Sequence, residues 1–357
     1  MKRELHNGKQ DGLEPLESLD LDKVHSFSDL LQKMSKTAFG GRCLGEALDV
    51  LVKMNNDPGC KKVLTLSGAM TIAKMGKILC DMIEASMVDV IISTGAIMAH
   101  GLSENIGGVH YKHNPRMSDK TLWGWGYNRV YDTIEKEENL NDTERMVGGV
   151  FAQLTKNRPT CSSELTRMIG KNLMDQGMMP SILGCAYKHK VPVYIPAFTD
   201  SELGLDFSNY QISQKFSHGE KAEPEAIFSH PPSFNPFYDL YDYATRAVRA
   251  EKLGIFTIGG GVPRNWAQQV APYVDIINER MGFELRAPRF QYGIRICPEP
   301  VHWGGLSGCT YSEGVSWGKF VDPAEGGCYA EVYCDATIAW PILVKAFLEQ
   351  KKRKKKS

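Results

Sequence analysis

A lysine, a tryptophan and a glutamate stand close together near the end of this 357-residue chain. They are Glu313, Trp317 and Lys319, in a segment that reads E-G-V-S-W-G-K. Burial beside an indole favours the neutral form of a lysine, and a neutral lysine amine is a nucleophile that forms Schiff bases. Glu313 acts in the opposite direction, because a carboxylate stabilises the cation or binds a substrate amine. The pattern indicates an activated amine; the alternative is a solvated surface lysine beside a packed tryptophan.

Three turns rich in glycine and hydroxyl groups follow short apolar runs. They are Ser67-Gly68-Ala69, Thr94-Gly95-Ala96 and Gly259-Gly260-Gly261, and each is expected to precede a helix. Glycine lets the backbone approach a diphosphate closely, and a helix N-terminus adds N–H donors and a partial positive charge. None has the spacing G-x-G-x-x-G, so each turn alone is also compatible with a tight turn that binds nothing. The three together favour a nucleotide site.

Asp200 is a further candidate, because it follows the apolar run 191–196 by four residues. An acidic side chain beyond a strand can bind the diol of a ribose. The same residue could instead cap a helix or form a turn.

Apolar runs and helical patterns alternate from residue 62 to the end of the chain, and many of these runs lack polar alternation. Such runs are typical of a parallel sheet that is covered on both faces. The sequence therefore predicts an α/β fold: a Rossmann-like, doubly wound, mostly parallel sheet with helices on both faces and ligands beyond the carboxyl ends of the strands. The strand candidates are Lys62–Leu66, Val88–Ser93, Val191–Pro196, Ile255–Ile258, Val274–Asn278, Phe290–Cys297 and Ala330–Cys334. The helix candidates are 71–86, 163–175, 240–253 (with Gly254 as its stop) and 338–350, and a helical pattern over 29–54 is interrupted at Gly40-Gly41.

We expect one α/β domain over residues 29–350, since no linker rich in Pro, Gly or Ser interrupts the alternation. A polar N-terminal arm (1–28) precedes it and a basic tail (351–357) follows. Residues 110–141 are rich in Trp, Tyr, Asn and charge and are expected to run over the sheet edge. Without the six basic residues of the tail, 36 basic residues face 42 acidic ones, which argues against a nucleic-acid surface. The tail could touch RNA or an anionic membrane, but it is expected to stay solvated and disordered.

Composition excludes several classes of protein. Hydrophobic residues make up 42% of the chain and charged residues 24%, which is ordinary for a globular protein and excludes a disordered one. Nine cysteines without a C-x-x-C pair, behind a start that lacks a signal peptide pattern, predict a reduced, cytoplasmic protein. No apolar run approaches the ~20 residues of a membrane span. The nine histidines show no metal-ligand spacing, so no metal site is predicted.

The segment around the lysine also resembles a known family. S-E-G-V-S-W-G-K at 312–319 resembles the E-A-V-S-W-G-K segment of deoxyhypusine synthases, with Gly314 in place of the alanine. Further matches follow in the family's order at 66–71, 88–96, 127–130, 196–200, 203–204, 259–261 and 333–336. The chain is identified as a member of this family or of its deoxyhypusine synthase-like branch.

The resemblance implies an NAD-dependent transferase of an aminobutyl group, assembled as a homotetramer with sites at dimer interfaces. In the family, NAD takes hydride from spermidine beside its secondary amine, and the active-site lysine captures the imine with loss of diaminopropane. An acceptor amine then displaces the lysine, and NADH reduces the product. By position Lys319 is that lysine, with Trp317 and Glu313 lining the polyamine site. The positions that match NAD contacts of the family are Thr94, Gly95, Ala96, Asp200, Gly259, Gly260, Asp335 and Ala336; Ser67, in the first turn, is an additional candidate.

The substrate-contacting positions depart from the family in four places. Asn265 replaces a histidine, and Asn can form hydrogen bonds but cannot act as a base near neutral pH. Leu306 replaces an aspartate, another aspartate is shifted by one position to Asp206, and Ala99-His100 replace an acidic pair. Asp206 and Asn265 therefore join Glu313 and Trp317 as the candidate substrate-binding residues.

We expect that NAD and the lysine chemistry are retained. We also expect that the aminobutyl group passes from a polyamine to a small amine acceptor, as in the related homospermidine synthases. Two alternatives stay open. One is a true deoxyhypusine synthase that acts on a translation-factor lysine. The other is a non-catalytic homologue that binds NAD or a polyamine, because a fold does not determine a function.

Overall fold

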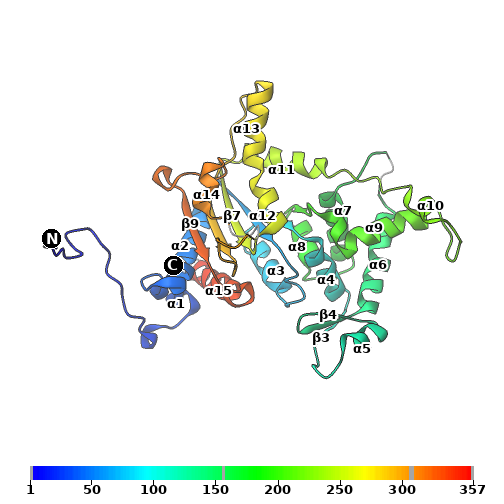
Figure 1. Ribbon diagram of the computed structural model, residues 1–357, viewed down its shortest axis with the longest axis horizontal. Coiled ribbons are helices and arrows are strands. Elements are labelled where there is room, and N and C mark those ends of the chain that lie inside the picture. Colours follow the sequence, from blue (N-terminus) through cyan, green and yellow to red (C-terminus); the bar gives the residue numbers. More distant parts are fainter. Residues whose placement is uncertain (1–2, 155–156, 305–308, 355–357) are drawn as a thin grey trace.

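Six parallel strands form the central sheet of the protein (Figure 1). The structure is a computed structural model that describes residues 3–154, 157–304 and 309–354. The strands are β1 (Cys60–Leu66), β2 (Val90–Ser93), β6 (Val193–Tyr194), β7 (Lys252–Ile258), β8 (Phe290–Ile296) and β9 (Cys328–Val332). Their spatial order is β6-β2-β1-β7-β8-β9, which is 3-2-1-4-5-6 when these six strands are numbered along the chain. That order is typical of dinucleotide-binding folds and confirms the predicted doubly wound sheet.

Helices cover both faces of the sheet. On one face, α2 (Phe39–Asn56), α3 (Gly76–Glu84) and α15 (Ala336–Lys354) belong to the larger hydrophobic cluster. On the other face, α11 (Phe237–Arg249), α12 (Gly261–Gln268) and α14 (Tyr311–Ser316) contribute to a second cluster. The neighbours Val63 and Leu64 of β1 belong to different clusters, because successive side chains of a strand point to opposite faces.

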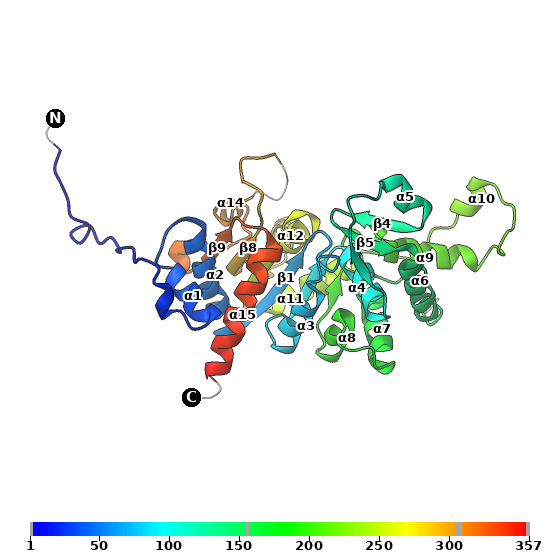
Figure 2. The same ribbon diagram turned by 90° about the horizontal axis from the view of Figure 1, so that it is seen from below.

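Beyond the β6 edge, the chain builds a mostly helical part that Figure 2 shows on the right. It contains α4 (Gly95–Asn105), α6 (Glu137–Phe151), α7 (Ser162–Asp175), α8 (Ile182–Lys188), α9 (Glu202–Ser213) and α10 (Pro224–Phe228). Residues 110–141, expected to run over the sheet edge, also lie there, and residues 110–136 include a second, antiparallel sheet that the sequence did not predict. This small sheet has the order β3-β5-β4, from β3 (His110–Lys112), β4 (Tyr127–Val130) and β5 (Thr133–Lys136), and α5 (Asp119–Gly124) lies between its strands in the sequence.

Two predicted elements were wrong. Gly254 does not end a helix, since α11 ends at Arg249 and Gly254 lies inside β7. A Cβ atom on Gly254 would lie 2.4 Å from the sulfur of Met54, so this glycine admits a close side-chain contact. Residues 274–278, expected as a strand, belong to α13 (Val270–Met281), whose buried residues Val270, Ala271 and Val274 have helical spacing.

The two ends of the chain differ from their predicted pattern. The helical break near the start lies at residues 35–38, between α1 (Phe27–Met34) and α2, so Gly40-Gly41 fall inside the first turn of α2. The last helix continues past residue 350 to Lys354, where Arg353 forms an ion pair with Asp29 of α1 at 2.9 Å. Residues 3–19 are exposed, form neither helix nor strand, and extend away from the body of the protein (Figure 2). The boundaries of arm, domain and tail stay predictions.

Two further observations concern the whole chain. Among the described residues, no helix is both long enough and apolar enough to cross a membrane. All nine cysteines lie within the described residues and are free.

The α7–α8 contact provides a test of this packing. A Cβ atom on Gly170 of α7 would lie 2.2 Å from the carbonyl oxygen of Leu183 in α8, and backbone cannot yield as a flexible side chain does. We expect Gly170→Ala to lower the free energy of unfolding by roughly 1–3 kcal/mol, the usual cost of overpacking. Urea denaturation followed by circular dichroism measures this change.

The matched control is Gly149→Ala in α6, where an added Cβ atom meets nothing within 4 Å. Alanine has the higher helix propensity, so this variant should gain up to about 1 kcal/mol. Equal stability of the two variants would contradict the close α7–α8 contact.

Candidate active site

The winding of the chain reverses between β1 and β7, and this switch point places two of the predicted turns side by side. Ser67 follows β1, and its hydroxyl accepts a hydrogen bond from the Gly260 N–H (3.0 Å) and donates one to the Ile258 carbonyl (3.2 Å). Gly259 has φ 82°, and a Cβ atom there would lie 2.0 Å from the Ser67 Oγ. In doubly wound sheets, ligands bind in the crevice at such a reversal.

The Thr94 turn joins the same edge. Thr94 caps α4: its hydroxyl accepts a hydrogen bond from the Ile97 N–H (3.4 Å) and donates one to the Gly68 carbonyl (2.8 Å), which ties the turn after β2 to the turn after β1. A Cβ atom on Gly95 would lie 1.9 Å from the Ser201 Oγ, so glycine lets the chain after β6 come close. Ala96, half-buried, is the second residue of α4.

Helices begin directly after two of the three turns. The first residues of α4 and α12 are Gly95 and Gly261, so both turns present helix N-termini to the carboxyl edge of the sheet. After Ser67, in contrast, α3 begins only at Gly76, and the expectation of a helix directly after that turn was wrong.

The predicted acidic residues lie toward the two ends of this edge. Asp200 follows β6, is exposed, and does not cap α9, which is preceded by Ser201. Asp335 follows β9 and accepts hydrogen bonds from the N–H and the hydroxyl of Thr337 (both 2.6 Å) in the first turn of α15, which begins at Ala336. Asp335 therefore has a capping role, although its side chain stays exposed.

Lys319 is buried, with 8% of its surface exposed, although the surface of a protein is the usual place for a lysine. Its ammonium nitrogen lies 5.7 Å from the centroid of the Trp317 ring. Burial lowers the pKa of Lys319; Arg264 lowers it further, while Cys309 and Glu313 act in the opposite direction. Among the described residues, no carboxylate forms an ion pair with this nitrogen. The site therefore has the ingredients of an activated amine.

Local packing explains how the chain holds Lys319. Beyond the end of α14, the Lys319 carbonyl accepts a hydrogen bond from the Phe290 N–H (3.0 Å) at the start of β8. A Cβ atom on Gly314 would lie 2.4 Å from the ring of Phe320, the residue after the lysine. Gly314 is the residue at which the segment departs from E-A-V-S-W-G-K. Its lack of a side chain leaves room for the ring of Phe320.

The other predicted substrate residues do not surround Lys319 within one chain. Trp317 is 63% exposed, and Glu313 on α14 and Asn265 on α12 are exposed as well. Asp206 lies on α9, which packs against α4 and α6 and is far from α14 in Figure 1. Burial raises the pKa of Asp206 to about 7, and the carboxylates of Glu144 and Glu202 add to this rise. Leu306 lies outside the described residues.

Lys319 and the glycine turns also stand at different ends of the strands. Lys319 pairs with the first residue of β8, whereas Gly259 and Gly260 lie at the carboxyl edge. Seven strand residues span about 20 Å. Even so, α12 and α14 cover the same face of the sheet, so the lysine and the turn before α12 share that face.

Sequence reasoning missed Arg264. It is buried on α12, lies over the Tyr311 ring at 5.6 Å, and donates a hydrogen bond to the Cys309 carbonyl (2.6 Å). Its positive charge is one reason for the lowered pKa of Lys319. The only signal in the sequence was its position in the helix that follows the triple glycine.

A cavity of about 830 Å³ lies apart from these residues, between α7, α8 and α11. Its lining includes the cationic side chains of Arg158, Arg167, Lys188, Lys190 and Arg246, whose charge exceeds that of the two lining carboxylates, Glu164 and Asp242, each of which already pairs with an arginine. A polyamine is itself a cation and needs carboxylates at its ends. The cavity therefore does not fit the predicted substrate.

Comparisons with known proteins decide the family. The family described as "Deoxyhypusine synthase" matches residues 29–347 of the chain. The chain belongs to the deoxyhypusine synthase family. Its relatives include "Probable deoxyhypusine synthase 2" of Methanosarcina acetivorans, which is 34% identical over 330 residues (92% of this chain and 88% of the relative). The "Deoxyhypusine synthase-like protein" of Chlorobaculum tepidum is 30% identical over 332 residues, with the same coverage.

One solved structure agrees in fold over most of the chain. The crystal structure of a "putative deoxyhypusine synthase" from Entamoeba histolytica has a TM-score of 0.57 and 14% sequence identity, over 94% of this chain and 97% of that one. Deoxyhypusine synthases are transferases, so membership supports a transferase for this chain at the level of the family.

The lowered pKa of Lys319 can be tested without a substrate. Because its neutral form persists to lower pH, we expect an amine-acylating reagent to label Lys319 with a pH midpoint below that of an exposed lysine such as Lys215. Peptide mass spectrometry across a pH series, with each lysine normalised to its own plateau, separates acidity from accessibility. A midpoint for Lys319 at or above that of Lys215 would show that burial does not favour the neutral amine.

Proposed function

We propose that this protein is an NAD-dependent aminoalkyl transferase that moves an aminobutyl group from a polyamine to a small amine acceptor through an imine on Lys319. One observation carries the proposal. The lysine of the S-W-G-K segment is buried against Trp317, and no described carboxylate pairs with it. A lysine in this environment is prepared for nucleophilic attack.

The residues at the carboxyl edge fit a dinucleotide. Cβ atoms on Gly261 (φ 60°) and Gly68 (φ 72°) would meet nothing closer than 3.9 Å, so the backbone of both turns is open to a close ligand. The N-termini of α4 and α12 provide N–H donors for phosphate oxygens. The residues that would hold NAD are Ser67, Thr94, Gly95, Ala96, Asp200, Gly259, Gly260, Asp335 and Ala336. When bound, NAD supplies the two-electron chemistry, taking hydride from the donor amine and returning it to the product.

Lys319 carries the transferred group between donor and acceptor. Its neutral amine adds to the imine carbon of the oxidised donor, and a new C–N bond forms. The departing amine takes the electron pair of the broken C–N bond and a proton from the lysine nitrogen. An acceptor amine then displaces Lys319 by the same exchange. Trp317 provides an aromatic wall for the methylene groups and cationic ends of a polyamine, and Glu313 a carboxylate.

The changed substrate positions support an acceptor other than a translation-factor lysine. Asn265 has no basic nitrogen, and it is exposed on α12 beside the buried Arg264. The carboxylates of Glu144 and Glu202, which add to the raised pKa of Asp206, offer negative charge to a cationic amine, and a bound cation would in turn favour the charged form of Asp206. These side chains suit a small diamine better than a particular protein surface.

A second copy of the chain would complete the site. In one chain the Trp317 ring is exposed, and α14 is far from α9, the helix that carries Asp206 (Figure 1). An assembly in which one protomer brings Lys319 to the carboxyl edge of its partner would resolve both features. A homotetramer with shared sites is therefore part of the proposal.

The decisive experiment supplies NAD and spermidine, with putrescine or a purified translation factor as the acceptor. We expect homospermidine and diaminopropane by mass spectrometry, and a borohydride-trapped adduct on Lys319. Lys319→Arg should lower turnover by at least about a thousandfold, as expected for loss of a covalent catalyst, while the exposed-site control Lys215→Ala should not.

Other outcomes of this experiment decide between the alternatives. Labelling of the factor without homospermidine would show a true deoxyhypusine synthase. If NAD binds but no di- or polyamine leaves an adduct on Lys319, the protein is a non-catalytic homologue and the proposal fails.

A further inference from the structure

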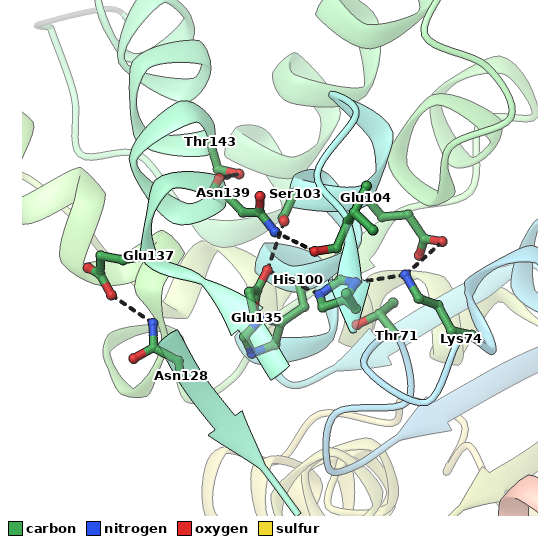
Figure 3. A network of polar contacts seen from close by, with 12 residues as sticks. Thr71, Lys74, His100, Ser103, Glu104, Asn128, Glu135, Glu137, Asn139 and Thr143 are labelled. Atoms are coloured by element: carbon green, nitrogen blue, oxygen red, sulfur yellow. Dashed lines mark hydrogen bonds and ion pairs between the residues drawn. The ribbon is translucent and has the colours of Figure 1, made fainter. Parts of the chain in front are cut away.

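Two histidines and a glutamate converge between α4 and the small sheet, and one of them, His100, stands at a position that departs from the family (Figure 3). His100 lies on α4, while His110 of β3 and Glu135 of β5 stand opposite each other in the antiparallel ladder. The side chains of His110 and Glu135 are each 1% exposed, and that of His100 is 10% exposed. One potential ligand atom from each residue lies within 4.8 Å of the other two.

Both histidines lie within ion-pair distance of Glu135, but neither contact has the geometry of a good hydrogen bond. His100 Nδ1 lies 2.5 Å from Glu135 Oε2, and His110 Nε2 lies 3.1 Å from Glu135 Oε1. Within the described chain, neither of these imidazole nitrogens nor Glu135 Oε2 has a hydrogen-bond partner of acceptable geometry. Buried polar atoms in that state are rare and need an explanation. Ligands of one metal ion have this arrangement, because each lone pair points at the ion and not at the next ligand.

The surroundings hold the three residues in place. The Ser103 hydroxyl, one turn after His100 on α4, donates a hydrogen bond to Glu135 Oε1 at 2.8 Å. The chain then returns through Gly107 (φ 98°) and Gly108, whose N–H donates to the Ser103 carbonyl at 2.8 Å. A Cβ atom on Gly108 would lie 2.6 Å from that carbonyl oxygen, so only glycine permits this close return to His110. Hydrogen bonds that orient a ligating carboxylate are a regular part of metal sites.

We propose that His100, His110 and Glu135 bind a divalent transition-metal ion, with zinc as the best match to two imidazoles and one carboxylate. Zinc takes such ligands at about 2.0–2.2 Å in tetrahedral geometry, which places ligand atoms about 3.3 Å apart. The 3.1 Å between His110 and Glu135 is close to this value, whereas the 2.5 Å between His100 and Glu135 must lengthen when the ion binds. Three protein ligands leave the fourth position to water. The ion fastens the β3-β5-β4 sheet to α4, whose first residue is Gly95. Spacing in the sequence could not reveal this set, because its members come from three elements.

Lys74 competes with the metal for His110. Its ammonium lies 2.7 Å from His110 Nδ1 and 3.2 Å from a carboxylate oxygen of Glu104. A lysine ammonium can only donate a hydrogen bond, so this contact needs an unprotonated Nδ1 on His110. In a neutral His110 the ring proton is then on Nε2, which is the atom that faces Glu135. Metal binding at Nε2 requires the opposite tautomer. The Lys74 side chain is 45% exposed and can turn away to Glu104 alone.

The test measures bound metal on the untagged full-length chain after treatment with a chelator. Cobalt(II) serves as the spectroscopic probe, followed by competition with zinc and by elemental analysis. We expect one ion per chain, with the absorption bands of tetrahedral cobalt. Glu135→Gln and His110→Gln should lose this binding, and Ser103→Ala should weaken it roughly 10- to 100-fold, as is usual for partners of a ligand. Lys74→Ala, which removes the competing donor, should bind cobalt more tightly than the native chain.

The controls separate the site from general metal binding and from misfolding. His218→Ala removes an exposed imidazole and Lys215→Ala an exposed ammonium, and both should bind cobalt like the native chain. Circular dichroism establishes whether each variant is folded. If a ligand variant is not folded, the tighter cobalt binding expected of Lys74→Ala still tests the site. The proposal is overturned if neither the native chain nor Lys74→Ala retains an ion, or if folded Glu135→Gln binds cobalt as tightly as the native chain. Because bound metal is the readout, this outcome is independent of amine transfer.

Discussion

The pairing of β1 with β7 is the constraint on which the rest of the structure depends. Seven consecutive residue pairs, from Cys60 with Lys252 to Leu66 with Ile258, join segments that are about half the chain apart. A buried hydrogen bond between the hydroxyls of Thr65 and Thr257 (2.9 Å) lies within this pairing. A slip of one residue would exchange the two faces of a strand that is buried on both sides, so the register is strongly specified. That register brings Ser67 against Gly259 and Gly260, and it places the Thr94 turn one strand away.

The catalytic proposal rests on a different balance, between desolvation and charge. An isolated ammonium in the interior is costly, and the protein reduces the cost by favouring the neutral amine. Arg264 strengthens this effect at Lys319, whereas Glu313, exposed on α14, weakens it. Asp206 illustrates the same physics for an acid, because burial and two neighbouring carboxylates favour its neutral form. An amine with a lowered pKa and a carboxyl with a raised pKa therefore lie in different parts of the same chain.

Much of the fold followed from local patterns. The strands β1, β7, β8 and β9 and the helix α7 lie within a few residues of their predicted positions, because continuous apolar runs and helical spacing are strong signals. Gly254 was misread because its role depends on Met54, some 200 positions earlier in the chain, and no local pattern reports such a contact. Val270–Met281 was misread because a short apolar run does not distinguish strand from buried helix. The site shows the same division: Lys319 was found from its neighbours in the sequence, but Arg264 and the His100–His110–Glu135 set emerge only when distant segments meet.

The last helix has a practical consequence for experiments. It begins at Ala336, on the edge of the sheet where the glycine turns lie, and continues for 19 residues to Lys354. At 1.5 Å per residue, its far end is about 28 Å from that edge. The ion pair between Arg353 and Asp29 anchors this far end to the first helix. A fluorophore or surface tether attached at the end of α15 would therefore be carried on the side opposite to the turns, which leaves that edge free for ligands in immobilised or single-molecule measurements.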